Sequence, residues 1–385
     1  MTQAFPGTPE EFVDDVARLE AGDPDGMLRA VASAAAQVRE AAVLAAEAGV
    51  PTLADEGRPR SVVVCGMGGS GIAGDVLVAV AGQTCPVPIV SHRGYGLPAW
   101  VGAADLVVAV SCSGTTEETL SALEAAVRRG SRLLVVGAAD SPLEALAAQG
   151  RGIFVPVTQG RQPRANVWSL SIPLVLAGHA LGLLQAGPDV IEATAVQLEQ
   201  TAVRCRPDAD HFVNPAKILA LQTTGCLPVV WGTSPLAGVA AYRLACQFNE
   251  NAKLPAVWGV LPEASHNQVV AFDGPFAGSA AVPEEDFFRD REDEVTVERT
   301  RMRLVLLQDT EEQPQVTRRV AVVRELAEER GVAVSPIEAE GASPLERLAS
   351  LVSVADWATT YLALLEGRDP TPVDAITALK QRTPR

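Results

Sequence analysis

The sequence predicts an α/β protein with two doubly wound parallel sheets in tandem, preceded by a helical segment. Three observations predict this fold. Apolar strand patterns alternate with amphipathic helix patterns over residues 61–183, and the same alternation restarts near residue 227. The strand segments are continuous Val, Ile and Leu runs, which are typical of strands covered on both faces. At 385 residues, the chain is also longer than one ordinary core requires.

The first element is a helical segment over residues 1–60. Apolar residues recur at helical spacing from residue 9, and an Ala-rich run continues to residue 49. This pattern predicts two helices before the first strand.

The first sheet domain is predicted over residues 61–187. Short apolar runs bounded by Gly, Pro and Ser predict strands, and the longer amphipathic stretches between them predict helices. The predicted strands are 61–65, 87–91, 105–110, 132–136 and 152–156, and the helices are about 71–81, 116–129, 141–148 and 167–183.

The second sheet domain, residues 188–365, begins with a helix-rich linker near 188–225 and then repeats the rhythm of the first. The predicted strands are 227–232, 255–260, 302–307 and 332–338, and the helices are 236–248, 315–330 and 344–365. An acidic stretch over 273–299 is expected to be a solvated loop. Residues 366–385 form a C-terminal segment with one short helix.

The composition excludes several classes of function. A formal net charge of −16 and a pI near 4.8 argue against a nucleic-acid partner held by phosphate neutralisation. We see neither a secretory leader pattern nor 18 uninterrupted apolar residues, so we expect a soluble, cytoplasmic protein without a membrane span. The six cysteines lack metal-ligand spacing, and Cys65 and Cys226 are expected to be buried apolar groups.

Two turns at strand ends carry the clearest binding pattern. Residues 66–71 (Gly-Met-Gly-Gly-Ser-Gly) allow close backbone approach to a ligand, and residues 111–116 (Ser-Cys-Ser-Gly-Thr-Thr) are rich in hydroxyls. Bare amides, hydroxyls and helix N-termini together bind phosphate. Neither turn contains Lys or Arg, so dipoles and hydroxyls would hold the anion. A dinucleotide site is not indicated, because no acidic residue ends the next strand about 20 residues on.

The corresponding turn of the second sheet domain, residues 232–236, lacks a Gly-rich loop. We therefore expect it not to hold a second phosphate.

The first pair of turns resembles the sugar isomerase (SIS) domain, which binds phosphorylated sugars. The resemblance implies that Ser70, Ser111, Ser113 and Thr116 bond the substrate phosphate and that Gly69 contributes its amide. Glu117 and Glu118 follow the second turn, where acidic residues also favour a helix N-terminus without any role in binding.

Three later stretches carry groups suited to aldose–ketose isomerisation. They are Gln247–Lys253 (Gln-Phe-Asn-Glu-Asn-Ala-Lys), Pro262–Asn267 (Pro-Glu-Ala-Ser-His-Asn) and the segment from Asp369 to Lys380. The reaction needs a base that moves a proton between C1 and C2, a group that opens the sugar ring, and a positive group for the enediolate. Glu, His, Lys and Arg are suitable for these roles.

From about residue 60 to Lys380 the chain resembles the bifunctional phosphoglucose/phosphomannose isomerase family, which also has two tandem SIS domains. The resemblance implies that Glu250 shuttles the proton and that His266, donated by the second subunit of a homodimer, assists ring opening. It implies that Lys380 contacts the ring oxygen or its hydroxyl and that Arg164 stabilises the enediolate. The implied substrate is a hexose 6-phosphate, with no metal or cofactor.

Several alternatives remain open at this point. Glu263 competes with Glu250 as the base, and Arg164 has the alternative of an ordinary surface cation. The residue that makes room around C2 for mannose is either Thr371 or Val373. A non-catalytic sugar-phosphate sensor would use the same phosphate turns.

Overall fold

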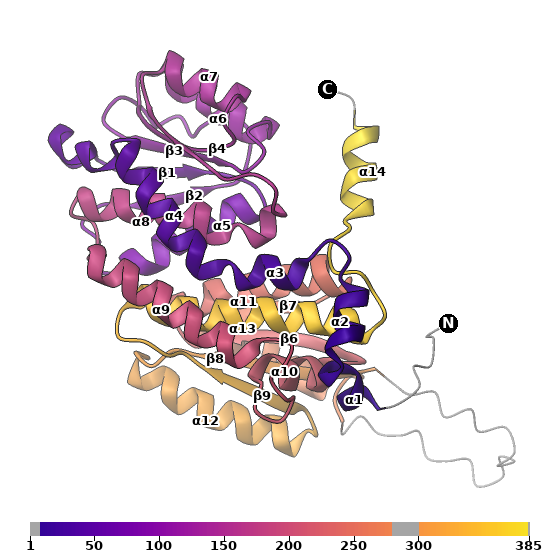
Figure 1. Cartoon of the computed structure of the whole chain (residues 1–385). Coiled ribbons are helices and arrows are strands. Elements are labelled where there is room, and N and C mark those ends of the chain that lie inside the picture. Colours follow the sequence, from indigo (N-terminus) through magenta and orange to yellow (C-terminus); the bar gives the residue numbers. More distant parts are fainter. Residues whose placement is uncertain (1–7, 279–299, 384–385) are drawn as a thin grey trace, which may run out of the picture. The chain divides into compact units, whose positions relative to one another are not determined.

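The computed structural model describes residues 8–278 and 300–383. It divides the chain into two compact units. The sheet-1 unit consists of Gly26–Val203 and Glu340–Ser353, and the sheet-2 unit consists of Met1–Asp25, Arg204–Ala339 and Val354–Arg385. Both units are mixed α/β with one parallel sheet each, which confirms the predicted fold class (Figure 1).

The sheet-1 unit contains five parallel strands in the order β2-β1-β3-β4-β5. Because the order reverses between β1 and β3, their carboxyl ends flank the switch point where open α/β sheets bind ligands. The strands are β1 (Val62–Cys65), β2 (Ile89–His92), β3 (Leu106–Ser111), β4 (Arg132–Gly137) and β5 (Ile153–Pro156).

Helices cover both faces of this sheet, with α5 and α8 on one side and α6 and α7 on the other (Figure 1). Val63, Val107 and Val135 pack against Ala122 and Leu123 of α6 on one face, and Val108 is buried as well, so the strands are covered on both faces. The helices are α3 (Met27–Ala32), α4 (Ala34–Glu47), η1 (Val50–Glu56), α5 (Gly69–Ala81), α6 (Glu117–Arg128), α7 (Pro142–Gln149), η2 (Pro163–Ala165), α8 (Val167–Ala180) and α9 (Pro188–Cys205).

The sheet-2 unit repeats this topology with four parallel strands in the order β7-β6-β8-β9, so β6 and β8 correspond to β1 and β3. The strands are β6 (Cys226–Gly232), β7 (Val257–Val260), β8 (Arg301–Gln308) and β9 (Ala333–Glu338). The helices are α1 (Pro9–Asp14), α2 (Val16–Gly22), α10 (Pro215–Thr223), α11 (Pro235–Gln247), the π-helical turn η3 (Phe248–Ala252), η4 (Glu263–His266), η5 (Gln268–Asp273), α12 (Pro314–Glu329) and α14 (Asp374–Arg382). Helix α13 (Pro344–Leu365) contributes residues to both units.

The prediction of two helices over residues 9–49 was wrong, because the structure has four. Asp15 ends α1 and caps α2, where its carboxylate accepts a hydrogen bond from the Arg18 amide at 3.2 Å. Gly26 begins α3 in the left-handed region at φ +73°. These short-range caps interrupt a periodicity that otherwise reads as continuous.

Two further expectations need correction or restriction. Cys226 is only partly buried, whereas Cys65 is buried as expected, and burial raises the pKa of the Cys65 thiol to about 12. Within the acidic stretch 273–299, residues 279–299 lie outside the described part of the chain.

Helix α13 has the length and hydropathy of a membrane span, but its apolar window is entirely buried, as in a core helix.

The N-terminal helices of the sheet-2 unit are fixed to α10 by a buried ammonium. Lys217 is fully buried, and its Nζ donates to Asp14 Oδ1 at 3.0 Å and to the carbonyls of Pro207 and Ala209 at 2.7 and 2.8 Å. Burial opposes ionisation of Asp14, but the hydrogen bonds from His211 and Lys217 outweigh it and lower the pKa of this carboxyl. A paired, hydrogen-bonded charge of this kind can be buried stably.

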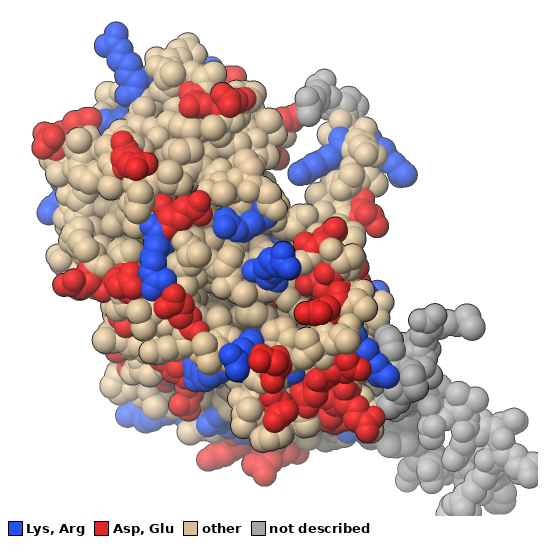
Figure 2. Space-filling model, in the orientation of Figure 1, with Lys and Arg blue, Asp and Glu red and all other residues tan. Residues whose placement is uncertain are grey.

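Figure 2 shows one face of the molecule, on which Lys and Arg side chains stand singly or in small groups among acidic ones. This face therefore lacks the broad basic band that phosphate-backbone binding needs.

Asp105 anchors the start of β3 and provides a test of the fold. The buried carboxylate accepts hydrogen bonds from Arg60 (2.6 and 2.9 Å), the Ser61 hydroxyl (2.8 Å) and the Gly102 amide (2.8 Å). Burial opposes ionisation, but these bonds, led by the one from Arg60, hold the pKa of Asp105 below its usual value.

We expect Asp105→Asn to lower the unfolding free energy at pH 7 by about 1.5–3 kcal/mol, the range for hydrogen bonds to a charged group. Because the folded-state pKa is lowered, the carboxylate stabilises the fold above its unfolded pKa of about 3.9. That stabilisation disappears as the pH falls through the folded-state pKa. Urea unfolding of both proteins at pH 7 and at about pH 3.5 should show the difference shrinking in acid; a difference that grew would contradict this account.

Candidate active site

The Gly-rich turn after β1 brings bare backbone to the switch point of sheet 1. A Cβ on Gly66 would lie 2.8 Å from the Ser70 carbonyl oxygen, so only glycine fits where the turn folds back onto the start of α5. Gly68 has φ +54°, a conformation that glycine adopts without strain. Helix α5 begins at Gly69, so the positive end of its dipole lies at this edge of the sheet.

The hydroxyl-rich turn after β3 lies at the same edge, because β1 and β3 pair in parallel. Ser111 Oγ lies 2.9 Å from Thr116 Oγ1, and the amide of Cys112 donates to Ser70 Oγ at 3.2 Å. Ser113 Oγ accepts from the amide and hydroxyl of Thr115 at 3.3 and 3.1 Å. The structure thus links Ser70 to the second turn, and we call the set Gly69, Ser70, Ser111, Ser113 and Thr116 the hydroxyl cradle.

The electrostatics of the hydroxyl cradle favour an anion. Helix α5 begins within the cradle and helix α6 begins directly after Thr116, so each helix contributes the partial positive charge of its N-terminus. Thr116 is the residue before α6, while Glu117 and Glu118 occupy the first turn of that helix, where they favour its positive end. Cys112 is buried behind the hydroxyls, and burial raises the pKa of its thiol despite an opposing hydrogen bond from Asn166.

Two arginines approach the Gly-rich turn from other parts of the sheet-1 unit. Arg164, in η2, is 3% exposed, and its Cα lies 3.6 Å from a Cβ built on Gly69. This burial overturns the alternative that Arg164 is a surface cation. Arg93 follows β2, with its Nε 2.9 Å from a Cβ built on Gly71, and it forms an ion pair with Asp75. The expectation that dipoles and hydroxyls hold the anion stays a prediction.

Glu250 lies in the sheet-2 unit, in the π-helical turn that follows α11. The turn is held by a buried polar network on α13. Asp356 pairs with Arg243 at 2.7 Å and accepts from Gln247 at 2.9 Å, and Asn251 donates to Thr359 at 3.1 Å. Residues 243, 247 and 251 share one helical face, and the half-buried Glu250 stands beside that face. It is therefore part of a fixed turn and not a freely solvated acid.

The other predicted catalytic groups of the sheet-2 unit lie in two places. His266 ends the short helix η4 and is exposed. Lys380 is exposed on α14, a helix in which none of the described residues is buried. Glu263, the competing base, is exposed and accepts a hydrogen bond from Asn267 at 3.0 Å. Thr371 is 5% exposed, and Val373 is half-buried.

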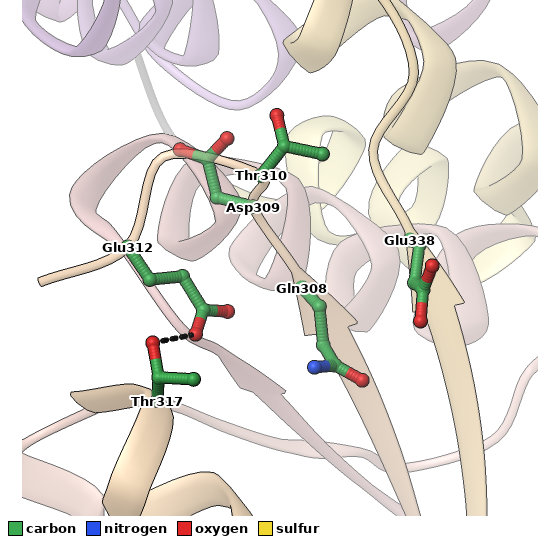
Figure 3. Close-up of a pocket in the computed structure, with 6 residues that line it drawn as sticks. All are labelled: Gln308, Asp309, Thr310, Glu312, Thr317 and Glu338. Atoms are coloured by element: carbon green, nitrogen blue, oxygen red, sulfur yellow. Dashed lines mark hydrogen bonds between the residues drawn. The ribbon is translucent and has the colours of Figure 1, made fainter. Parts of the chain in front are cut away.

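The corresponding edge of sheet 2 is lined by carboxylates. There, Ser234 donates to Asp309 Oδ2 at 2.8 Å and Thr233 accepts from the Asp309 amide at 2.9 Å, so a carboxylate fills the turn after β6. Figure 3 shows the cavity beside it, of about 320 Å³. Its lining residues are Gln308, Asp309, Thr310, Glu312, Thr317 and Glu338. These carboxylates would repel a phosphate.

The described residues contain no group of three or more His, Cys, Asp or Glu side chains placed to hold a metal ion. All six cysteines are free.

Comparisons with known proteins place the chain in a family. Residues 212–383 match the model of the bacterial phospho-glucose isomerase C-terminal SIS domain. The bifunctional phosphoglucose/phosphomannose isomerase of Caldicellulosiruptor bescii is 32% identical over 83% of this chain and 88% of its own length. The one from Aquifex aeolicus is 32% identical over 84% and 90%.

A crystal structure of a hypothetical protein from Thermus thermophilus has the same fold, with a TM-score of 0.69, 16% identity, and coverage of 97% of this chain and 93% of the other. The two sequence relatives are more than 30% identical to this chain over most of both lengths, which shows that they share one family with it. The chain belongs to the bifunctional phosphoglucose/phosphomannose isomerase family.

Proposed function

We propose that this protein interconverts glucose 6-phosphate, and also mannose 6-phosphate, with fructose 6-phosphate. The observation that carries the proposal is the hydroxyl cradle at the switch point of sheet 1, in a chain that belongs to a family of this name. Its hydroxyls and two helix N-termini match the needs of a dianionic phosphate ester. The cradle would hold the phosphate and leave the sugar carbons for groups outside it.

In the proposed mechanism Glu250 is the base that takes the proton from C2 of the open-chain aldose and returns it to C1. While the C2 proton moves to C1 through a cis-enediolate, the hydroxyl proton of O2 passes to O1 and the carbonyl passes from C1 to C2, so no electron acceptor is consumed. Arg164 would stabilise the negative charge that develops on the enediolate oxygens. The polar network that fixes the π-helical turn supports the choice of Glu250, because a base must be held in place to act.

Ring opening is assigned to His266 and Lys380, with His266 donated by the second subunit of a homodimer. Both side chains are exposed, and α14 also exposes Ile376 (41%) and Leu379 (68%). Exposed apolar groups beside a functional residue support a protein contact at that surface. For the pocket around C2 we assign Thr371, whose burial supports its role in a pocket wall over that of Val373.

A coupled assay on the purified full-length protein tests the proposal, with glucose 6-phosphate and mannose 6-phosphate as separate substrates. We expect fructose 6-phosphate from both. Folded protein that turns over no hexose 6-phosphate would contradict the proposed function and favour a sugar-phosphate sensor.

The hydroxyl cradle gives a prediction of its own. Thr116→Val keeps the shape of the side chain but removes a hydroxyl assigned to the phosphate, so we expect KM to rise about tenfold with kcat little changed. This is the pattern for a contact made equally in the ground and transition states.

Thr119→Val is the matched control for this substitution. The Thr119 hydroxyl is buried in α6 without a hydrogen-bond partner among the described residues, so its loss should leave KM unchanged. Steady-state kinetics of both variants decide the matter. Equal effects of the two substitutions would contradict the assignment of Thr116.

A further inference from the structure

Lys253 connects two segments of the sheet-2 unit that are more than a hundred residues apart. Its Nζ lies 2.7 Å from the carbonyl oxygen of Glu250 and 3.2 Å from that of Asn251. It also lies 3.3 Å from the carbonyl oxygen of Asp369 and 3.4 Å from that of Pro370. An ammonium has three N–H donors, so they are shared between the turn of the proposed base and the C-terminal segment.

The backbone of Lys253 makes this arrangement unusual. Its φ of +59° and ψ of +29° lie in the left-handed region, which a residue with a side chain adopts only with strain. Glycine would adopt the same conformation without that strain. A lysine at this position therefore indicates a use for its side chain, and the four carbonyl contacts supply one.

The C-terminal segment packs through its loop, where Pro370 and Thr371 are buried, and not through its helix. Helix α14 begins at Asp374, and none of its residues is buried in the described structure. Its direction is therefore set by the loop that leads to it from α13 (Figure 1). In that loop the Thr371 amide donates to Asp369 Oδ1 at 2.8 Å, and Lys253 holds the carbonyls of Asp369 and Pro370.

We infer that Lys253 is a positioning residue that holds the segment carrying Thr371 and Lys380 in register with Glu250. The inference rests on the proposed function, because it concerns the geometry between the proposed base and the proposed ring-opening lysine. Lys253 would touch backbone carbonyls and not the sugar. Its loss would release the start of α14 and misplace Lys380.

The informative variant is Lys253→Gly, which removes the ammonium and also relieves the left-handed strain, so folding is not expected to suffer. Lys253→Met is the second variant, and Lys253→Arg keeps a multiple donor. Arg330→Met is the matched control, because Arg330 is a cation of the same unit that pairs with Asp273 away from this loop. Thermal unfolding of each variant checks that the fold is kept.

Hydrogen–deuterium exchange tests the structural step without any need for activity. We expect amides of residues 366–382 to exchange at least severalfold faster in the Gly and Met variants, because a loop that loses its anchoring contacts opens more often. The Arg variant and Arg330→Met should exchange like the wild type. Unchanged exchange in the Gly and Met variants would overturn the inference, even if the wild type proved to have no turnover.

Kinetics test the catalytic step. Misplacing a reacting group by about 1 Å can cost on the order of 100-fold, so we expect kcat/KM to fall about 10–100-fold in the Gly variant and to recover largely with Arg. If Lys253 acts through Lys380, the same substitution in a Lys380→Met background should cost only a few-fold more. Full additivity would overturn the inference. Absence of turnover in the wild type would instead contradict the proposed function, and the exchange experiment would still decide the role of Lys253.

Discussion

Glu250→Gln is expected to reduce turnover of hexose 6-phosphates by about 10²–10⁴-fold, the usual contribution of a general base. The amide has the size of the carboxylate but cannot accept the C2 proton. Because the phosphate is assigned to the hydroxyl cradle and not to Glu250, binding of the substrate should change little. Calorimetric titration with fructose 6-phosphate measures the binding, and a coupled assay measures the turnover.

Glu263→Gln is the control for this experiment. Glu263 is exposed and accepts a hydrogen bond from Asn267 within its own loop, and glutamine can accept that bond equally well. We expect its kinetics to match the wild type. If Glu263→Gln lost turnover and Glu250→Gln kept it, the two acids would have to exchange roles.

A second readout separates the proton-transfer step from other defects. The wild type should exchange the C2 hydrogen of glucose 6-phosphate with deuterium from D₂O, because the enediolate is formed reversibly. Glu250→Gln should lose this exchange together with turnover, whereas a variant impaired only in ring opening should retain exchange with the open-chain sugar. Retention of exchange in Glu250→Gln would contradict its role as the base.

The strands of both sheets could be predicted from the sequence because their information is local. Continuous apolar runs such as 106–110 need burial on both faces, and Gly and Ser punctuate their ends, so the predicted and observed bounds differ by only one or two residues. The two turns of the hydroxyl cradle could also be located in the sequence, because their residues follow two such strands directly. Parallel pairing of β1 and β3 then brings the two turns to one edge.

What could not be predicted depends on contacts between distant residues. Nothing near Arg93 in the sequence indicates that its guanidinium reaches Gly71, because the contact arises only when β2 pairs beside β1. The buried Arg243–Asp356 pair joins residues on α11 and α13. Both charges read as surface groups in an amphipathic pattern, since charged residues are rarely fully buried unless paired.

The turn after β6 in the second sheet contains a carboxylate contact that the sequence does not indicate. The missing Gly-rich loop predicts that the turn after β6 holds no phosphate. The structure adds that both hydroxyls of this turn are hydrogen-bonded to Asp309. The Asp309 carboxylate accepts from the Ser234 hydroxyl, and the Asp309 amide donates to the Thr233 hydroxyl. The sequence shows the missing glycines, but only the fold brings the Asp309 carboxylate to the Ser234 hydroxyl.

The homodimer assignment leads to the second large effect, which is restoration of activity by mixing two inactive variants. Glu250→Gln lacks the base, and His266→Ala lacks the group assigned to ring opening. In a two-fold symmetric dimer that exchanges His266, a mixed dimer contains one site with both lesions and one site with neither. Each variant alone should have turnover near the background of the assay.

Random assembly makes about half of the dimers mixed, and half of the sites in those dimers are intact, so about a quarter of wild-type activity should return. The two chains are refolded together or co-expressed with different tags, and sequential affinity purification isolates the mixed dimers. Their turnover should then approach about half of the wild-type value, one intact site in two.

A pairing of Glu250→Gln with Lys380→Met is the control for this complementation. Lys253 ties the turn of Glu250 to the segment that leads to Lys380 within one chain, so both lesions should affect sites in which Glu250 and Lys380 come from the same subunit. Every mixed dimer then has two damaged sites, and no activity should return. If isolated mixed dimers of Glu250→Gln and His266→Ala were equally inactive, His266 would have to act within its own subunit, because only exchange across the interface can separate the two lesions.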